Sequence, residues 1–123
     1  MNDLKWRILG LSALSLTTAA CGGAAVSQEA VVAAKSSVSA AEAVGAKDEP
    51  QASLHLKIAK DDIEYAERMI EENKNDEARA ALERAKYDAN LALALTEEVK
   101  TKEAAEKAAA RVQELKKENG DLS

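Results

Sequence analysis

Residues 51–73, QASLHLKIAKDDIEYAERMIEEN, decide the fold. Apolar side chains recur there at alternating steps of four and three residues, which is the spacing of one face of an α-helix packed against another helix. The members of this seam are Ala52, Leu56, Ala59, Ile63, Ala66 and Ile70. Charged residues fill most of the other positions, so the sequence predicts a helix over about 51–73 with one buried face.

A second helix is predicted directly after a polar, turn-prone cluster, Asn73-Lys74-Asn75-Asp76. No Gly or Pro interrupts the chain over about 76–118. An apolar stripe begins there in step with the first seam, and its members are Ala78, Leu82, Ala85, Ala89 and Ala92. The stripe is expected to continue through Ala105, Ala108, Val112 and Leu115. Together the two segments predict an elongated, coiled-coil-like antiparallel hairpin.

An Ala- and Val-rich helix is predicted before the hairpin, over about 28–44. Ser27 suits its N-cap and Gly45 its C-terminal end. This helix either packs on the hairpin or forms a mobile stalk. The second hairpin helix is longer than its partner, so residues 99–115 need a cover, which either the first helix or a second copy of the chain would supply.

The composition indicates an all-α class. The 123 residues contain no Phe, five Gly and one Pro, and Ala, Glu and Lys are abundant, as in long helices. The length suits one small domain. The formal net charge of -5 argues against binding to nucleic acid, because a phosphate backbone attracts basic surfaces.

The first 20 residues have the order of a secretory signal: Lys5 and Arg7, then an apolar run, then small residues up to Ala20. The apolar run is shorter than the ~20 residues that a transmembrane helix needs. We therefore expect a signal peptide over 1–20, a flexible tether over 21–26 and a helical domain over 27–123.

Cys21, the only cysteine, directly follows the signal, and here the sequence resembles a bacterial lipobox. Ala19, Ala20 and Cys21 match that motif, whereas Thr18 stands where Leu is usual. The resemblance implies cleavage before Cys21 and lipid on its sulfur. Gly22, which is not Asp, resembles an outer-membrane sorting signal, so the expected location is the outer membrane, facing the periplasm. The alternative is an ordinary secreted protein with an incidental cysteine.

From residue 51 onward the chain resembles a family of bacterial envelope lipoproteins known as domain of unknown function 4398. The matching features are Ala-Lys-x-x-Ile-x-x-Ala at 59–66, Glu-Ala-Arg at 77–79, and Leu82-x-x-Ala85-x-x-Asp88-Ala89-x-Leu91-Ala92. Members often resemble the front half of proteins that end in a peptidoglycan-binding domain. Peptidoglycan therefore enters as a partner suggested by the family and by no motif of this chain.

No catalytic, cofactor-binding or metal-binding residue is predicted. His55 is the only histidine and has no Cys or second His near it in sequence. Neighbouring acidic residues such as Asp61 and Asp62 diverge by about 100° on a helix, so they do not converge on one metal ion or proton.

The leading hypothesis is a structural or protein-interaction lipoprotein, bound to the membrane through lipid on Cys21 and to an envelope protein or a second copy of itself. The alternatives are a soluble secreted helical binding module or chaperone-like coiled coil, and an accessory protein of cell-wall organisation.

Overall fold

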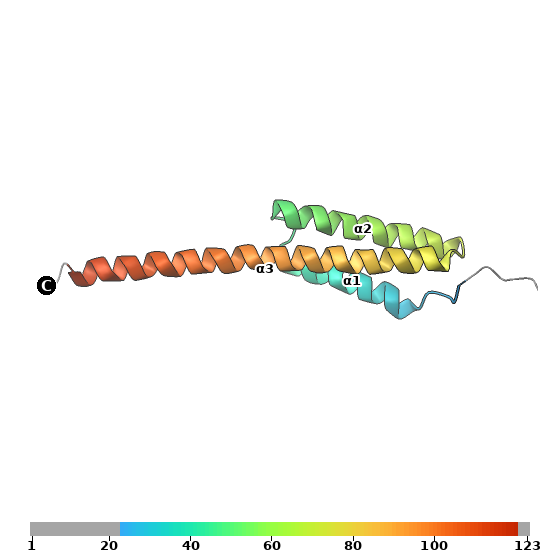
Figure 1. Cartoon of the computed structure of the whole chain (residues 1–123), viewed down its shortest axis with the longest axis horizontal. Coiled ribbons are helices and arrows are strands. Elements are labelled where there is room, and N and C mark those ends of the chain that lie inside the picture. Colours follow the sequence, from blue (N-terminus) through green and yellow to red (C-terminus); the bar gives the residue numbers. More distant parts are fainter. Residues whose placement is uncertain (1–22, 121–123) are drawn as a thin grey trace, which may run out of the picture.

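The structure, a computed structural model, describes residues 23–120 and contains three α-helices. These are α1 (Gln28–Ala43), α2 (Pro50–Glu71) and α3 (Asn75–Gly120), and no strand occurs within the described range (Figure 1). The helices α2 and α3 form an antiparallel hairpin (Figure 1). The predicted all-α fold with a helical hairpin is confirmed.

The ends of α1 follow the sequence signals. The Ser27 hydroxyl accepts a hydrogen bond from the backbone N–H of Ala30 at 3.2 Å, which is an N-cap. After the helix, Gly45 adopts a φ of 88°, and the N–H of Ala46 donates to the carbonyl of Ala41 at 3.1 Å. This is the left-handed exit that favours glycine, because a side chain is strained at positive φ.

The hairpin turn is built on asparagine instead of glycine. Asn73 has a φ of 58°, and the N–H of Lys74 donates to the carbonyl of Met69 at 2.8 Å. Asparagine visits this left-handed region more readily than most residues. The chain thereby reverses between Glu71 and Asn75, which brings α3 back along α2.

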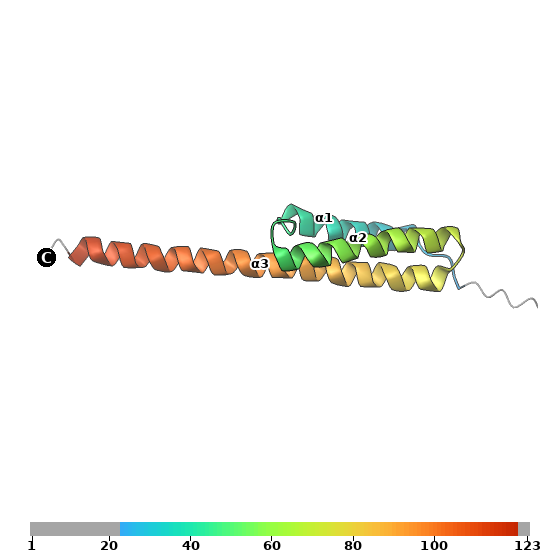
Figure 2. The same ribbon diagram turned by 90° about the horizontal axis from the view of Figure 1, so that it is seen from above.

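Both shorter helices pack on the same long one. The helix α1 lies chiefly against α3, with a smaller contact to α2, and the two views show the three as a triangular bundle (Figures 1 and 2). The buried face of α1 consists of Val31, Ala34, Val38 and Ala41. Of the two predicted arrangements for this helix, the structure therefore shows the packed one.

Alanine dominates the interface between the helices. Ala34, Ala59, Ala66, Ala85 and Ala89 are all completely buried. Because an alanine adds only one methyl group to the contact, an alanine seam allows helix axes to approach toward the near end of the usual 8–10 Å range. Among residues 23–120, the largest side chains that are fully enclosed are those of Leu82 and Thr96.

A tightly packed alanine seam should not tolerate a larger side chain, and this can be tested. Ala85→Leu adds three carbon atoms to a site with no exposed surface, so we expect it to lower the free energy of unfolding by about 1–3 kcal/mol. The same substitution at Ala110, which is exposed, should change it by less than about 0.5 kcal/mol. Urea unfolding followed by circular dichroism measures both, and equal effects would contradict a tightly packed seam.

Candidate interaction surface

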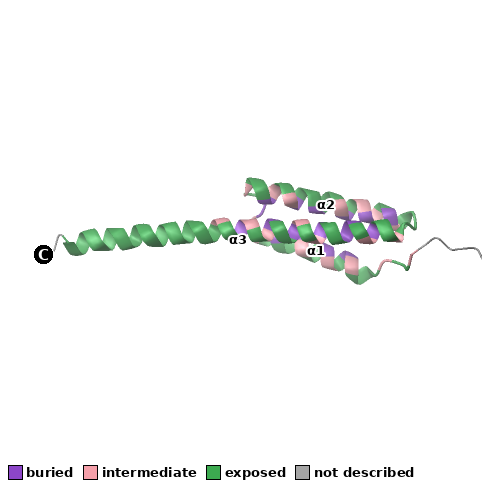
Figure 3. Ribbon diagram, viewed as in Figure 1, coloured by how far each residue is buried: buried purple, intermediate pink, exposed green. Residues whose placement is uncertain are grey.

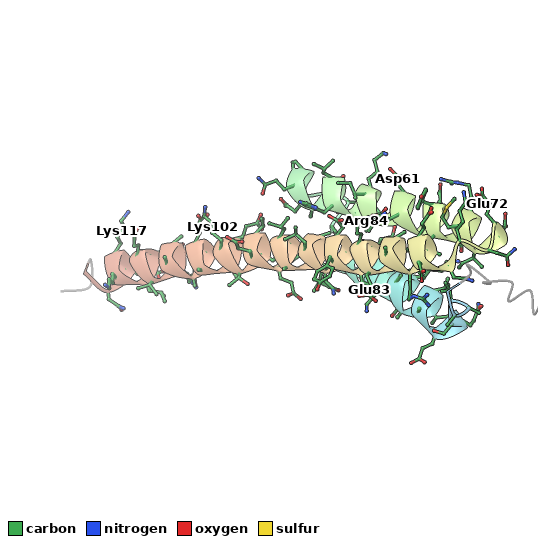
Figure 4. All side chains as sticks on the ribbon, turned by 45° about the vertical axis from the view of Figure 1, so that its right-hand side comes forward. Asp61, Glu72, Glu83, Arg84, Lys102 and Lys117 are labelled. Atoms are coloured by element: carbon green, nitrogen blue, oxygen red, sulfur yellow. The ribbon has the colours of Figure 1, made fainter. Side chains whose placement is uncertain are left out.

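The helix α3 continues well past the end of its partners. The first residues of α2, Pro50 and Gln51, lie against Leu95 and Val99 of α3. Beyond that point every residue from 101 to 120 is exposed (Figure 3). We call residues 101–120 the arm, and its side chains, including Lys102 and Lys117, project into solvent (Figure 4).

The predicted cover of the arm by the first helix is wrong. With 16 residues, α1 is about 24 Å long, and it starts near the hairpin turn. It therefore ends beside the part of α3 that α2 also covers, and it does not reach the arm (Figure 1). Of the two covers predicted for this part of α3, a second copy of the chain is the one that remains.

The apolar stripe of the arm also does not continue the seam of the bundle. The buried residues Ala89, Ala92 and Thr96 lead, at steps of three and four, to Val99 and then to the charged Glu103. At about 100° per residue, Ala105, Ala108, Val112 and Leu115 lie on roughly the opposite side of the helix. The expectation of one continuous stripe is corrected: α3 has two apolar faces, one turned toward α1 and α2 and one turned outward.

The outward face of α3 carries the large apolar side chains that the bundle leaves uncovered. Tyr87 is 75% exposed, Leu91 42%, Val112 50% and Leu115 41%. Most of the remaining surface of α3 is charged or alanine. The outward face is therefore the apolar feature of α3 that packing within the chain does not explain.

The described chain begins at the end of the bundle opposite to the arm. The side-chain amide of Asn75 donates to the carbonyl of Gly23 at 3.2 Å, and Arg79 donates to the carbonyl of Ala24 at 3.0 Å. These bonds hold the start of the chain beside the hairpin turn, while Gly120 lies at the far end of α3 (Figure 1).

Polar contacts across the hairpin fix its register. His55 Nδ1 lies 2.7 Å from Asp88 Oδ1, and Arg84 donates to Asp62 at 2.7 and 3.3 Å. Figure 4 shows Arg84 pointing toward α2. The guanidinium of Arg84 gains a carboxylate partner, which raises its pKa above the ordinary value. Neither pair was predicted from the sequence.

A shallow hollow lies between α2 and α3, and its polar lining is already engaged. Asp61, Asp62, Tyr65, Glu77, Ala80 and Arg84 line it. Asp61 pairs with Lys57, and the Tyr65 hydroxyl donates to Glu77 at 3.2 Å. Within residues 23–120 no group of three His, Cys, Asp or Glu side chains is placed to hold a metal ion. The absence of catalysis stays a prediction.

An ion pair joins α1 to α2. Lys60 Nζ lies 2.5 Å from Glu42 Oε1, and Lys47 Nζ is 3.5 Å from the same oxygen. The hydrogen bond from Lys60 lowers the pKa of Glu42 below its ordinary value. Folding therefore favours the ionised carboxylate, and this contribution to stability is present above the ordinary pKa and is lost as the pH falls through the folded-state pKa.

Glu42→Gln tests that linkage. At pH 7 the variant should unfold more easily by up to about 1 kcal/mol, the size of an exposed ion pair. At pH 3 this deficit should be smaller, because protonation of the wild-type carboxylate increases as the pH falls. The matched control is Glu106→Gln on the arm, which should be neutral at both pH values. A Glu42→Gln deficit that is the same at both pH values would contradict the pairing. Urea unfolding at the two pH values measures the difference.

The residues predicted from the sequence fall into two groups. Leu56, Ala59, Ile63, Ala66, Ala78, Leu82, Ala85, Ala89 and Ala92 are buried between the helices. Ile70 is half-buried, and its neighbour Met69 is buried in its place. Cys21 and its cleavage context, Thr18, Ala19, Ala20 and Gly22, lie outside the described residues.

Comparisons with protein-family models, with curated proteins and with solved structures find no match. The resemblance to the envelope lipoprotein family therefore stays a prediction. Within residues 23–120 none of the helices combines the length and the apolar character that crossing a bilayer requires.

Proposed function

We propose that this protein is a lipid-anchored, non-catalytic component of a bacterial cell envelope that holds a helical arm away from the membrane surface. The observation that carries the proposal is the placement of the two ends of the molecule. The described chain starts beside the hairpin turn, and the arm projects from the opposite end of the bundle (Figure 1).

The anchor in this proposal is acyl chains on Cys21. Two or three chains hold a protein stably on a membrane, where a single chain is marginal. Gly23 is two residues from Cys21, a span of at most about 7 Å of backbone. An anchored molecule would therefore keep the turn end of its bundle close to the lipid headgroups, in the periplasm and, by the Gly22 signal, on the outer membrane.

The bundle and α3 supply the reach. The 46 residues of α3 form a helix about 70 Å long at 1.5 Å per residue. The bundle braces its first half through cross-helix pairs such as His55–Asp88 and Arg84–Asp62. The exposed arm then serves as the surface on which a partner docks, at tens of ångströms from the membrane.

Metabolic labelling with palmitate tests the anchor. The wild-type protein should take up the label, because lipid is attached to the Cys21 sulfur, and Cys21→Ala should take up none. Ser27→Ala, which retains Cys21, should be labelled like the wild type. Label that persists on Cys21→Ala would remove the anchor from the proposal.

Detergent partitioning separates this proposal from the secreted alternative. An acylated protein enters the detergent phase, whereas a secreted helical binding module stays in water. We expect the wild type in the detergent phase and Cys21→Ala in the aqueous phase. A wild-type protein that stays in the aqueous phase would favour the secreted module.

A further inference from the structure

The outward face of α3 has the spacing of a coiled-coil seam. Alternating steps of four and three residues connect Tyr87, Leu91, Ala94, Glu98, Thr101, Ala105, Ala108, Val112 and Leu115. All four large apolar residues of α3 that are exposed belong to this series. Packing within the chain leaves at least 41% of each of these four residues exposed, so the seam fits a helix from outside the chain.

We propose that a second copy of this chain packs on this face in antiparallel orientation, with Leu91 of each chain against Leu115 of the other. The arm of each molecule then lies along the outward face of the other molecule's bundle. This inference goes beyond the proposed function and does not depend on acylation of Cys21.

The apolar layers of this arrangement are self-complementary. With Leu91 against the partner's Leu115, the next layers place Ala94 against the partner's Val112, Glu98 against Ala108 and Thr101 against Ala105, and the two-fold axis repeats each layer. Leu91, Val112 and Leu115 each meet an apolar residue of the partner, whereas Tyr87 meets the partner's Asn119 at the end of the overlap. Glu98 is the single charge in the seam, and its aliphatic stem can cover Ala108 while its carboxylate reaches water.

The charges beside the seam match in the same register. Each heptad has two positions that flank the seam, e and g. In an antiparallel pair, an e position of one helix lies beside an e position of the other, and a g position lies beside a g position. Glu97 then faces the partner's Arg111, and this pair occurs twice per dimer. The two Lys102 side chains face each other once, which is the only like-charge contact between these flanking positions.

Other registers lose this complementarity. Sliding the chains apart by one heptad puts Leu115 against the partner's Glu98 and Glu97 opposite Glu118. A parallel, in-register pair stacks the two Glu98 side chains in the seam and places Arg111 beside the partner's Lys116, although Glu97 would then meet Lys102. Buried or adjacent like charges are costly, so the charge pattern selects one antiparallel register.

The length of the overlap also favours this register. The arm alone offers about 30 Å of helix, with Val112 and Leu115 as its only large apolar residues. The proposed overlap begins at Tyr87 and extends for about 50 Å, and it includes the patch where Leu91 lies beside Leu54. A stable interface needs roughly 800 Å² from each partner, which the longer overlap approaches much more closely than the arm alone.

One consequence links the dimer to the anchor. The two bundles, and with them the two Gly23 ends, lie at opposite tips of the antiparallel rod. If Cys21 carries the anchor, the dimer joins two facing membrane surfaces. This consequence rests on the proposed function, whereas the dimer itself does not.

Disulfide trapping tests the orientation. In the full chain carrying Cys21→Ser, which cannot be acylated, Ala94→Cys and Val112→Cys are made as separate proteins. Mixed under oxidising conditions, the two should form a disulfide between them, because these positions share a layer. Each protein alone should form little, since like positions are about 27 Å apart along the axis. Efficient disulfides within either single protein would indicate a parallel pair and overturn the proposal.

Sedimentation equilibrium tests the association itself. The Cys21→Ser chain should be a concentration-dependent dimer, and Leu115→Glu should raise the dimer Kd at least tenfold. Val32→Glu, at an exposed site on α1, should leave it unchanged. Glu97→Arg and Arg111→Glu should each weaken the dimer, and the double variant should recover most of the loss. A chain that stays monomeric up to about 1 mM would overturn the proposal whatever the palmitate result.

Discussion

The structure depends on how closely its helices approach across alanine. Ala34, Ala41, Ala59, Ala66 and Ala85 have no exposed surface, and each contributes only a methyl group to the contact between helices. Such contacts bury little apolar area for each residue, so their contribution to stability is small and must be repeated over many turns. This explains why three helices are needed, and why both shorter ones pack on a single long one.

Because the apolar core is thin, polar contacts between the helices contribute more to fixing their register. Layers of alanine resemble one another, so they specify the alignment of two helices only weakly. Paired side chains specify it better, since His55 meets Asp88, and Asp62 meets Arg84, in one alignment only. Glu42 and Lys60 do the same for α1 and α2. Individually these pairs are weak, yet they distinguish between otherwise similar packings.

The sequence predicted the helices well because helix periodicity and caps are local signals. Ser27, Gly45 and the steps of the α2 seam needed no knowledge of tertiary structure. The pairs across the hairpin were missed, although a signal exists: His55 and Asp88 lie at similar distances along the chain from Asn73, and so do Asp62 and Arg84. The sequence predicted one continuous stripe where α3 has two apolar faces. The reason is that apolar positions read in sequence order do not show at which angle around the helix each one lies.

The arm shows why that angle matters. A helix of 20 residues alone in water is marginal, mainly because its first turn is costly to form, but the arm extends a helix that the bundle has already nucleated. Its residues are mostly good helix formers, and Glu103–Lys107 and Arg111–Glu114 add local ion pairs. The arm therefore needs no apolar stripe to remain helical. The side of the arm in line with the bundle seam carries Glu103 and Glu106, so that side does not extend the bundle. The large apolar residues of the arm, Val112 and Leu115, lie on the opposite side, in register with Tyr87 and Leu91. They serve neither helix formation nor packing within the chain, and contact with another helix is the physical role that this placement fits.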